Sequence, residues 1–543
     1  MWRPRADGLK RGVRPTCPAM RDQRSGRPET QAFASRFHMI LAPQRRKNPP
    51  AAKWNARHNG RDFAPARPQS ARSTCDLDAA AKWGTMAREA SMTDHRHHTD
   101  AASSTGEERA AAYAEAYAAA QPDPGHQVVA VEMEAREIDW EFVPGVSTRA
   151  WGFNGTIPGP TLEATVGDVL EIRLTNRLPE PTVVHWHGLR IPAAMDGTDM
   201  VQRPVGPGET FTYRFRLPDA GTFWYHSHFN ETVQLERGLY GALIVRAPDE
   251  PVFDADRTLV LDDVELEKNG QIKPPGWWLE SHDGREGSTR LVNGKQEPEI
   301  RMAAGQIERW RLVNAASARY VLLSVGGRPF RIIGTDGGLI PSPVTATEVL
   351  LPAADRVEIA VGPFAEGETL RIETLPFKRG SFKAHSKPEL FATVQVGAAA
   401  PSRTRLPDRL REIEPLVTGP VTPNRDVRLG FSLGLKHGVE FNINREQHHH
   451  AEPVRVGELQ IWDVINRSPV HHPFHLHGFF FQVLEVNGKP PGFLSWEDTV
   501  NVPAFGSVRI AWMPDDRPGG WMYHCHILEH HAAGMMAHFD VVR

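Results

Sequence analysis

The stretch VGDVLEIRLTN, at residues 166–176, decides the fold, because this 543-residue chain contains it three times. The second copy is AGQIERWRLVN at 304–314, and the third is VGELQIWDVIN at 456–466. In every copy the final asparagine follows the glycine by nine positions. Between them apolar and polar residues alternate, as in a half-buried β-strand. A unit that recurs at domain-scale separation predicts tandem copies of one fold.

The composition favours an all-β protein. The chain has 46 Gly and 45 Pro, which separate short apolar runs such as TFTYRFRL (210–217), YGALIVRA (240–247) and FFFQVLEV (479–486). We therefore expect Greek-key β-sandwiches. A net charge of −3 gives no sign of a nucleic-acid partner. No run of eighteen apolar residues occurs, so we predict no membrane span.

The predicted organisation has five parts. Residues 1–125 form a basic, Ala-rich extension that we expect to be disordered, because its first ninety residues are too rich in Arg and Pro to bury a core. Its last part, GEERAAAYAEAYAAAQ (106–121), has the composition of a helix. The three β domains are predicted at 126–248, 255–397 and 425–543, with a linker at 398–424.

The motif His524-Cys525-His526 predicts a metal site. The other two cysteines lie in the N-terminal extension, so Cys525 is a free thiol or a ligand. On a strand its sulfur faces one way and the flanking imidazoles face the other. Cysteine, two imidazoles and a weak thioether are the ligands of a blue copper site, and His530 and Met535 follow closely. One residue of backbone would then join two metal sites.

Three further His-x-His pairs accompany this motif. They are His185-Trp186-His187, His226-Ser227-His228 and His475-Leu476-His477. On a strand both imidazoles of a pair point to the same side. A single pair is weak evidence, but four pairs offer more imidazoles than one metal ion can bind. We therefore predict a three-metal cluster between the first and third domains, which must meet face to face.

These motifs resemble those of the multicopper oxidases, in particular the three-domain bacterial laccase-like enzymes. The resemblance runs from about His126 to the C-terminus. It implies three cupredoxin domains and about four copper ions per chain. The implied type 1 copper ligands are His472, Cys525, His530 and, in the axial position, Met535. The implied type 2 ligands are His185 and His475. The implied type 3 ligands are His187, His226 and His526 on one ion and His228, His477 and His524 on the other.

The resemblance also implies the reaction. A type 1 copper would take single electrons from a small reducing substrate, and the cluster would reduce O2 to water. We expect laccase-like oxidation of phenols and aromatic amines, because no methionine-rich segment lies between Asn444 and His472. The alternative is oxidation of cuprous or ferrous ion, with Asp498 and Glu497 as ferrous ligands or, more simply, as turn residues. A copper-free structural relative is disfavoured because no ligand position is vacant.

Two residues are candidate proton relays for water formation. Asp196, eleven residues after His185, matches the position of a carboxylate in similar enzymes. It lies in MDGTD and is equally well interpreted as a turn residue. His531 stands where related bacterial enzymes carry a glutamate. It is either a relay near neutral pH or a neutral replacement.

The assembly and the compartment are less well defined. We expect a monomer. The resemblance implies export, whereas the first ninety residues show no apolar region of a secretory signal. The sequence therefore leaves the localisation open between an exported and a cytoplasmic protein.

Overall fold

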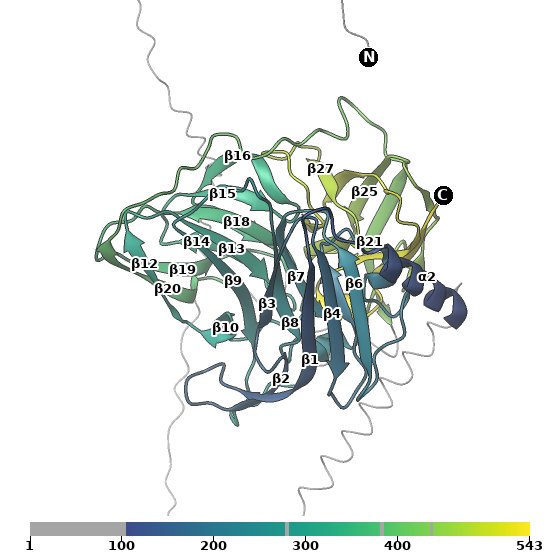
Figure 1. The fold of residues 1–543 in the computed structure, drawn as a ribbon, viewed down its shortest axis with the longest axis horizontal. Helices are drawn as coiled ribbons and strands as arrows, with labels where there is room; N and C mark the ends of the chain where they lie inside the picture. Colours follow the sequence, from purple (N-terminus) through teal and green to yellow (C-terminus); the bar gives the residue numbers. More distant parts are fainter. Residues whose placement is uncertain (1–104, 277–281, 381–384, 435–437) are drawn as a thin grey trace, which may run out of the picture. The chain divides into compact units, whose positions relative to one another are not determined.

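The computed structural model describes residues 105–276, 282–380, 385–434 and 438–543. These residues form three successive cupredoxin-type domains, each with two β-sheets (Figure 1). The prediction of an all-β protein with tandem sandwiches is confirmed. The disorder predicted for residues 1–104 lies outside the described residues. Among the described helices, none has the length and apolar character that crossing a bilayer requires.

The first domain has sheets in the order β2-β1-β4-β6 and β3-β8-β7-β5. In β4 the apolar residues alternate with polar ones, so Leu170, Ile172 and Leu174 all face the core. Its strands are β1 (Val128–Trp140), β2 (Thr148–Phe153), β3 (Gly159–Thr165), β4 (Val169–Asn176), β5 (Val184–His187), β6 (Thr210–Arg216), β7 (Gly221–Ser227) and β8 (Tyr240–Arg246). Two short helices, η2 (Ala193–Met195) and α3 (Glu231–Gln234), lie in its loops.

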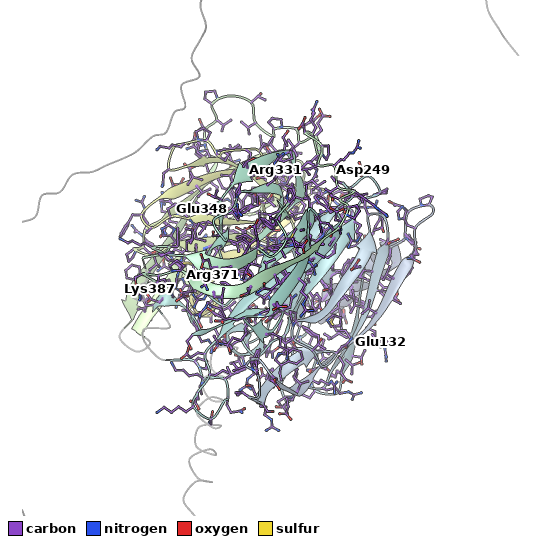
Figure 2. The ribbon with its side chains drawn as sticks, turned by 90° about the vertical axis from the view of Figure 1, so that its left-hand side faces the viewer. Glu132, Asp249, Arg331, Glu348, Arg371 and Lys387 are labelled. Atoms are coloured by element: carbon purple, nitrogen blue, oxygen red, sulfur yellow. The ribbon has the colours of Figure 1, made fainter. Side chains whose placement is uncertain are left out.

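The middle domain has sheets in the order β11-β10-β9-β13-β18-β15-β16 and β12-β20-β19-β14-β17. Its strands are β9 (Ala255–Val264), β10 (Thr289–Val292), β11 (Lys295–Gln296), β12 (Glu299–Ala304), β13 (Glu308–Asn314), β14 (Val321–Val325), β15 (Phe330–Thr335), β16 (Gly338–Ala346), β17 (Glu348–Leu351), β18 (Arg356–Val361), β19 (Thr369–Leu375) and β20 (Glu389–Ala399). The exposed side chains of Arg331, Glu348 and Arg371 belong to β15, β17 and β19 (Figure 2). Strand β20 extends past the predicted domain end at residue 397.

The third domain has sheets in the order β22-β21-β25-β29-β27 and β23-β31-β30-β26-β28, with β24 also paired to β31. Its strands are β21 (Arg425–Gly434), β22 (Gly438–Ile443), β23 (His449–His450), β24 (Val454–Arg455), β25 (Gln460–Asn466), β26 (His472–Leu476), β27 (Phe481–Val486), β28 (Thr499–Val502), β29 (Ser507–Trp512), β30 (Gly519–Cys525) and β31 (Met536–Val542). Helix α5 (Leu528–Ala532) joins β30 to β31.

The asparagine of the sequence repeat closes the same corner in each domain. Asn176, Asn314 and Asn466 are buried at the ends of β4, β13 and β25. The side-chain amide of Asn176 donates to the carbonyls of Glu180 and Val205, each at 2.8 Å. The other two asparagines make equivalent bonds to nearby carbonyls. Asparagine recurs because its amide satisfies buried backbone groups that an apolar side chain would leave unpaired.

Helix α2 (Gly106–Ala119) confirms the predicted helix and contradicts the disorder predicted for residues 105–125. Thr105 closes its first turn in a capping box. The ring of Tyr113 packs against Phe211 of β6, with centroids 5.1 Å apart. The hydroxyl of Tyr117, one turn later, donates to Glu171 at 3.1 Å. The contacts of Tyr113 and Tyr117 hold α2 alongside β6 (Figure 1). The composition of the extension gave no indication of them.

Candidate metal centre

Cys525, His472 and His530 converge within the core of the third domain. The Cys525 sulfur lies 3.4 Å from His472 Nδ1 and 3.5 Å from His530 Nδ1. The two Nδ1 atoms are 3.1 Å apart. All three side chains are fully buried. Strand β30 ends at the cysteine, β26 begins at the first histidine, and α5 carries the second.

The donor set of this site fits a soft cation. His530 Nε2 donates to the carbonyl of His282 at 2.9 Å. His472 Nε2 lies 2.7 Å from the hydroxyl oxygen of Ser468, whose own proton goes to a backbone carbonyl. Both rings therefore turn an Nδ1 lone pair toward the sulfur. Burial lowers the pKa of His472 to about 3 and raises the pKa of the Cys525 thiol well above its ordinary value. Two neutral imidazoles facing one sulfur are the ligand set of a type 1 copper.

Apolar side chains enclose the site. Phe441 stacks on His530, with ring centroids 3.8 Å apart and planes at 21°. Met535 is fully buried in the same core, and its carbonyl accepts a bond from the Cys525 amide at 3.1 Å. The axial ligation by Met535 that the sequence suggests stays a prediction.

A second centre gathers eight buried imidazoles from the first and third domains. They are His185, His187, His226, His228, His475, His477, His524 and His526. Across the domain boundary, His185 stacks on His477 with centroids 4.0 Å apart, and His187 stacks on His475 at 3.7 Å. The prediction that the outer domains meet face to face is therefore confirmed.

Backbone carbonyls fix which nitrogen faces the centre. Four rings donate Nδ1–H to a carbonyl at 2.8–3.0 Å, namely His185, His226, His475 and His524. Their Nε2 atoms therefore carry lone pairs. Among the described residues no hydrogen-bond partner is found for Nε2 of His185, His226, His228 or His475.

These inward lone pairs require cations. A buried polar atom without a partner costs about 1–3 kcal/mol. In addition, His477 Nε2 and His524 Nε2 face one another at 3.0 Å. Desolvation lowers the pKa of both imidazoles well below the ordinary value, so neither supplies a proton to the gap. Neutral imidazoles that point inward from several sides fit a cluster of copper ions.

Asp196 lies against this cluster, directly after η2. Its Oδ2 is 2.8 Å from His477 Nδ1, and its Oδ1 is 3.5 Å from His185 Nδ1. The side chain is 2% exposed, and burial raises the pKa of Asp196 to about 7. A carboxyl group that exchanges a proton near neutral pH is suited to a relay, and this role stays a prediction.

His531 is paired with a carboxylate that sequence reasoning missed. Its Nδ1 lies 2.6 Å from Glu231 Oε2, and the other oxygen of Glu231 lies 2.9 Å from His228 Nδ1. Burial would raise the pKa of Glu231, but the charges and hydrogen bonds of His228 and His531 hold it well below its ordinary value. Helix α3 thus supplies a carboxylate close to the position where related enzymes carry one. In the sequence, the position of Glu231 three residues after His228 was the only sign of this contact.

Asp498 and Glu497 are not arranged as a surface site for ferrous ion. Asp498 is 1% exposed, and its Oδ1 lies 3.1 Å from His187 Nε2. Glu497 is half-buried beside Ser495, and its pKa is raised well above the ordinary value by desolvation. The burial of Asp498 favours the structural interpretation of this segment, and its contact with the metal centre was not apparent from the sequence.

Comparisons with known proteins identify the family. Family models described as multicopper oxidase match residues 134–250, 224–365 and 421–543. Multicopper oxidase MmcO of Mycobacterium tuberculosis is 31% identical over 469 residues, which cover 78% of this chain and 89% of that protein. The chain belongs to the multicopper oxidase family.

Solved structures agree with this assignment. A multicopper oxidase of Campylobacter jejuni, described as a metallo-oxidase, has a TM-score of 0.69 at 31% identity and covers 76% of this chain and 91% of its own. A laccase of Pediococcus acidilactici has a TM-score of 0.66 at 28% identity and covers 78% and 92%. This protein is therefore a copper-dependent oxidase that reduces O2, and its histidine clusters fit a type 1 site and a trinuclear site. The assignment of each histidine to a particular ion stays a prediction.

Replacing Glu231 tests its contact with the cluster. We expect Glu231→Gln to weaken copper retention about 10–100-fold, because an amide cannot accept bonds from both His228 and His531. Competition with a chelator measures the retention. The control is Glu236→Gln, since Glu236 is also buried in this segment and burial raises its pKa to about 8, which makes a neutral amide a close substitute. Equal copper retention in the two variants would show that Glu231 does not support the copper site.

Proposed function

We propose that this oxidase takes its electrons from phenols and aromatic amines, in the manner of a laccase. The proposal rests on a line of aromatic rings between the protein surface and a type 1 ligand. Phe431 is 37% exposed and lies 6.5 Å from Phe441, which stacks on His530. An aromatic substrate that stacks on Phe431 would be separated from the copper ligand by two phenyl rings.

The protein also offers a proton acceptor beside this route. One-electron oxidation of a phenol to its phenoxyl radical releases one proton. The carboxylate of Asp283 lies 2.8 Å from His282 Nδ1. The His282 ring meets the edge of Phe431 at 6.3 Å, and its carbonyl accepts the bond from His530. The proposed proton acceptor therefore lies beside the proposed electron route, on a different segment of the chain. Copper, when bound, supplies the one-electron acceptor and the reduction of O2.

Oxidation of a metal ion is the second candidate function. The Campylobacter jejuni relative is described as a metallo-oxidase, which favours it. In this chain, His282 and Asp283 together carry an imidazole and a carboxylate suited to a transition-metal ion. Their position next to His530 would give such an ion a direct path for its electron.

Oxygen uptake with a phenol, an aromatic amine, ferrous ion and cuprous ion separates the two functions. We expect Phe431→Ser to lower kcat/KM for the phenol about tenfold, because a lost aromatic contact of about 1.4 kcal/mol corresponds to that factor. Asp283→Asn should lower kcat/KM for ferrous ion if metal ions are the substrate. Leu459→Ser is the control, since Leu459 is exposed to a similar degree, at 36%. The laccase assignment would be rejected if the protein oxidised metal ions faster than phenols and Phe431→Ser kept the wild-type kcat/KM for the phenol.

A further inference from the structure

Arg356, a residue of the copper-free middle domain, is buried where all three domains meet. It opens β18 and has no exposed surface. Its Nε donates to the carbonyl of Thr222 in the first domain at 3.2 Å. One terminal nitrogen donates to the Asp336 carbonyl in its own domain at 3.2 Å. Both terminal nitrogens bind the carboxylate of Asp498 in the third domain, the first of these contacts being 2.7 Å to Oδ1.

The carboxylate that Arg356 holds lies against two imidazoles of the trinuclear site. Asp498 Oδ1 is 3.1 Å from His187 Nε2 and 3.4 Å from His475 Nδ1. The two rings stack with centroids 3.7 Å apart. Among the described residues no partner is found for the remaining nitrogens, Nδ1 of His187 and Nε2 of His475. Asp498 therefore engages opposite nitrogens of two neighbouring rings and leaves the other nitrogen of each for metal.

We propose that Arg356 is a positioning residue for the trinuclear copper site and acts through Asp498. The planar guanidinium holds both carboxylate oxygens, so the carboxylate has one orientation. Asp498 held in this way fixes which nitrogen each ring turns toward the metal, because its carboxylate contacts His187 Nε2 and its backbone carbonyl accepts the Nδ1–H of His475. Partners of this kind orient ligands in metalloproteins, and their loss weakens metal binding about 10–100-fold. The middle domain thus contributes to a site whose ligands all come from its neighbours.

The charge of Asp498 supports this role. Burial acts to raise its pKa, but the charge of Arg356 and its hydrogen bonds lower the pKa below the ordinary range. An ionised carboxylate accepts the Nε2–H bond of His187 and places a negative charge 3.4 Å from His475 Nδ1, whose proton goes to the Asp498 carbonyl.

The first domain leaves space for the ion pair. Gly188, the residue after His187, has φ of +87°. A Cβ atom there would lie 2.5 Å from a terminal nitrogen of Arg356 and 2.6 Å from Asp498 Oδ2. Any larger residue would displace the pair, so the glycine of the histidine motif serves the contact between domains.

A nearby arginine provides a matched control. Arg311 is also fully buried in the middle domain and reaches the same residue of the first domain, with a bond of 3.2 Å to the Thr222 hydroxyl. Its carboxylate partners are Asp256 at 2.8 Å, Glu358 at 3.0 Å and Glu250 at 3.3 Å. Asp256 and Glu358 belong to the middle domain, so Arg311 joins two domains, and among the described residues no contact between Arg311 and a cluster histidine is found.

The test compares Arg356→Lys with Arg311→Lys in the copper-loaded protein. A lysine keeps the charge but cannot hold both oxygens of Asp498. In Arg356→Lys, the chelator concentration that removes half of the type 2 signal in electron paramagnetic resonance should fall about tenfold or more, while the blue absorption per chain stays unchanged. Because Arg311 has no contact with the cluster among the described residues, Arg311→Lys should either keep both the type 2 signal and the blue absorption or lose both in parallel. A type 2 signal in Arg356→Lys that resists the chelator as in the wild type would overturn the proposal, as would parallel loss of both signals.

A second variant keeps the test decisive if Arg356→Lys does not fold. Asp498→Asn preserves the volume of the side chain and replaces one acceptor oxygen by a donor, which opposes one of the two imidazoles. We expect the same selective loss of the type 2 signal. Full retention of that signal in Asp498→Asn would show that the carboxylate does not orient the ligands. The outcome concerns the copper site alone and is independent of the reducing substrate.

Discussion

Cys525→Ser should abolish the blue absorption and lower oxygen consumption by more than about 10³-fold. The colour of a type 1 site comes from charge transfer between thiolate and copper, and a serine hydroxyl cannot provide it. Burial keeps a free Cys525 thiol protonated, since it raises the pKa of the group well above its ordinary value. A bound cation is therefore needed to deprotonate the thiol and make the sulfur a thiolate ligand.

Cys525→Ser should leave the trinuclear site filled. The imidazoles of His524 and His526 belong to that site and do not depend on the sulfur for their position. Strand β30, which carries His524, pairs with β26 and β31, and the amide of His526 donates to the Pro473 carbonyl at 2.8 Å. Visible absorption, the type 2 signal and oxygen uptake measured on one sample distinguish the two sites. A variant that stays blue, or that turns over at the wild-type rate, would contradict the assignment of Cys525.

Asp196→Asn should lower kcat about 10²–10⁴-fold, the range for loss of a general acid or base. The carboxyl group touches His477 and lies close to His185, and an amide in its place cannot exchange a proton. Reduction of the type 1 site by substrate does not require that proton. In rapid mixing without oxygen, the blue colour should therefore bleach at the wild-type rate.

The defect of Asp196→Asn should appear when oxygen is added to the reduced protein. We expect slow return of the blue colour in this variant. Asp199→Asn, three residues later in the same loop and half-buried, is the matched control and should reoxidise normally. Normal reoxidation of Asp196→Asn would contradict the proton-relay role and leave Asp196 as a turn residue.

The parts of this protein that sequence predicted are those that local patterns encode. The spacing from Gly167 to Asn176 recurs because the asparagine must satisfy the same corner in each domain. The His-x-His pairs were readable because alternation along a strand places both rings on one side. The direction of Cys525 relative to His524 and His526 follows from the same rule.

The contacts that sequence did not predict join residues far apart in the chain. Asp498 and His187 are separated by 311 positions, and Arg356 and Asp498 by 142. An isolated aspartate in WEDTV looks the same whether it faces solvent or a metal site, because its partners come from other domains. Helix α2 was partly hidden for a similar reason, since its stability depends on Tyr113 packing against β6.

The most direct test of the copper assignment is metal analysis with visible absorption on wild-type protein reconstituted with copper. The arrangement of His472, Cys525 and His530 beside the eight cluster imidazoles predicts about four coppers per chain and an intense blue band. A colourless protein that retains fewer than about one copper per chain would contradict it.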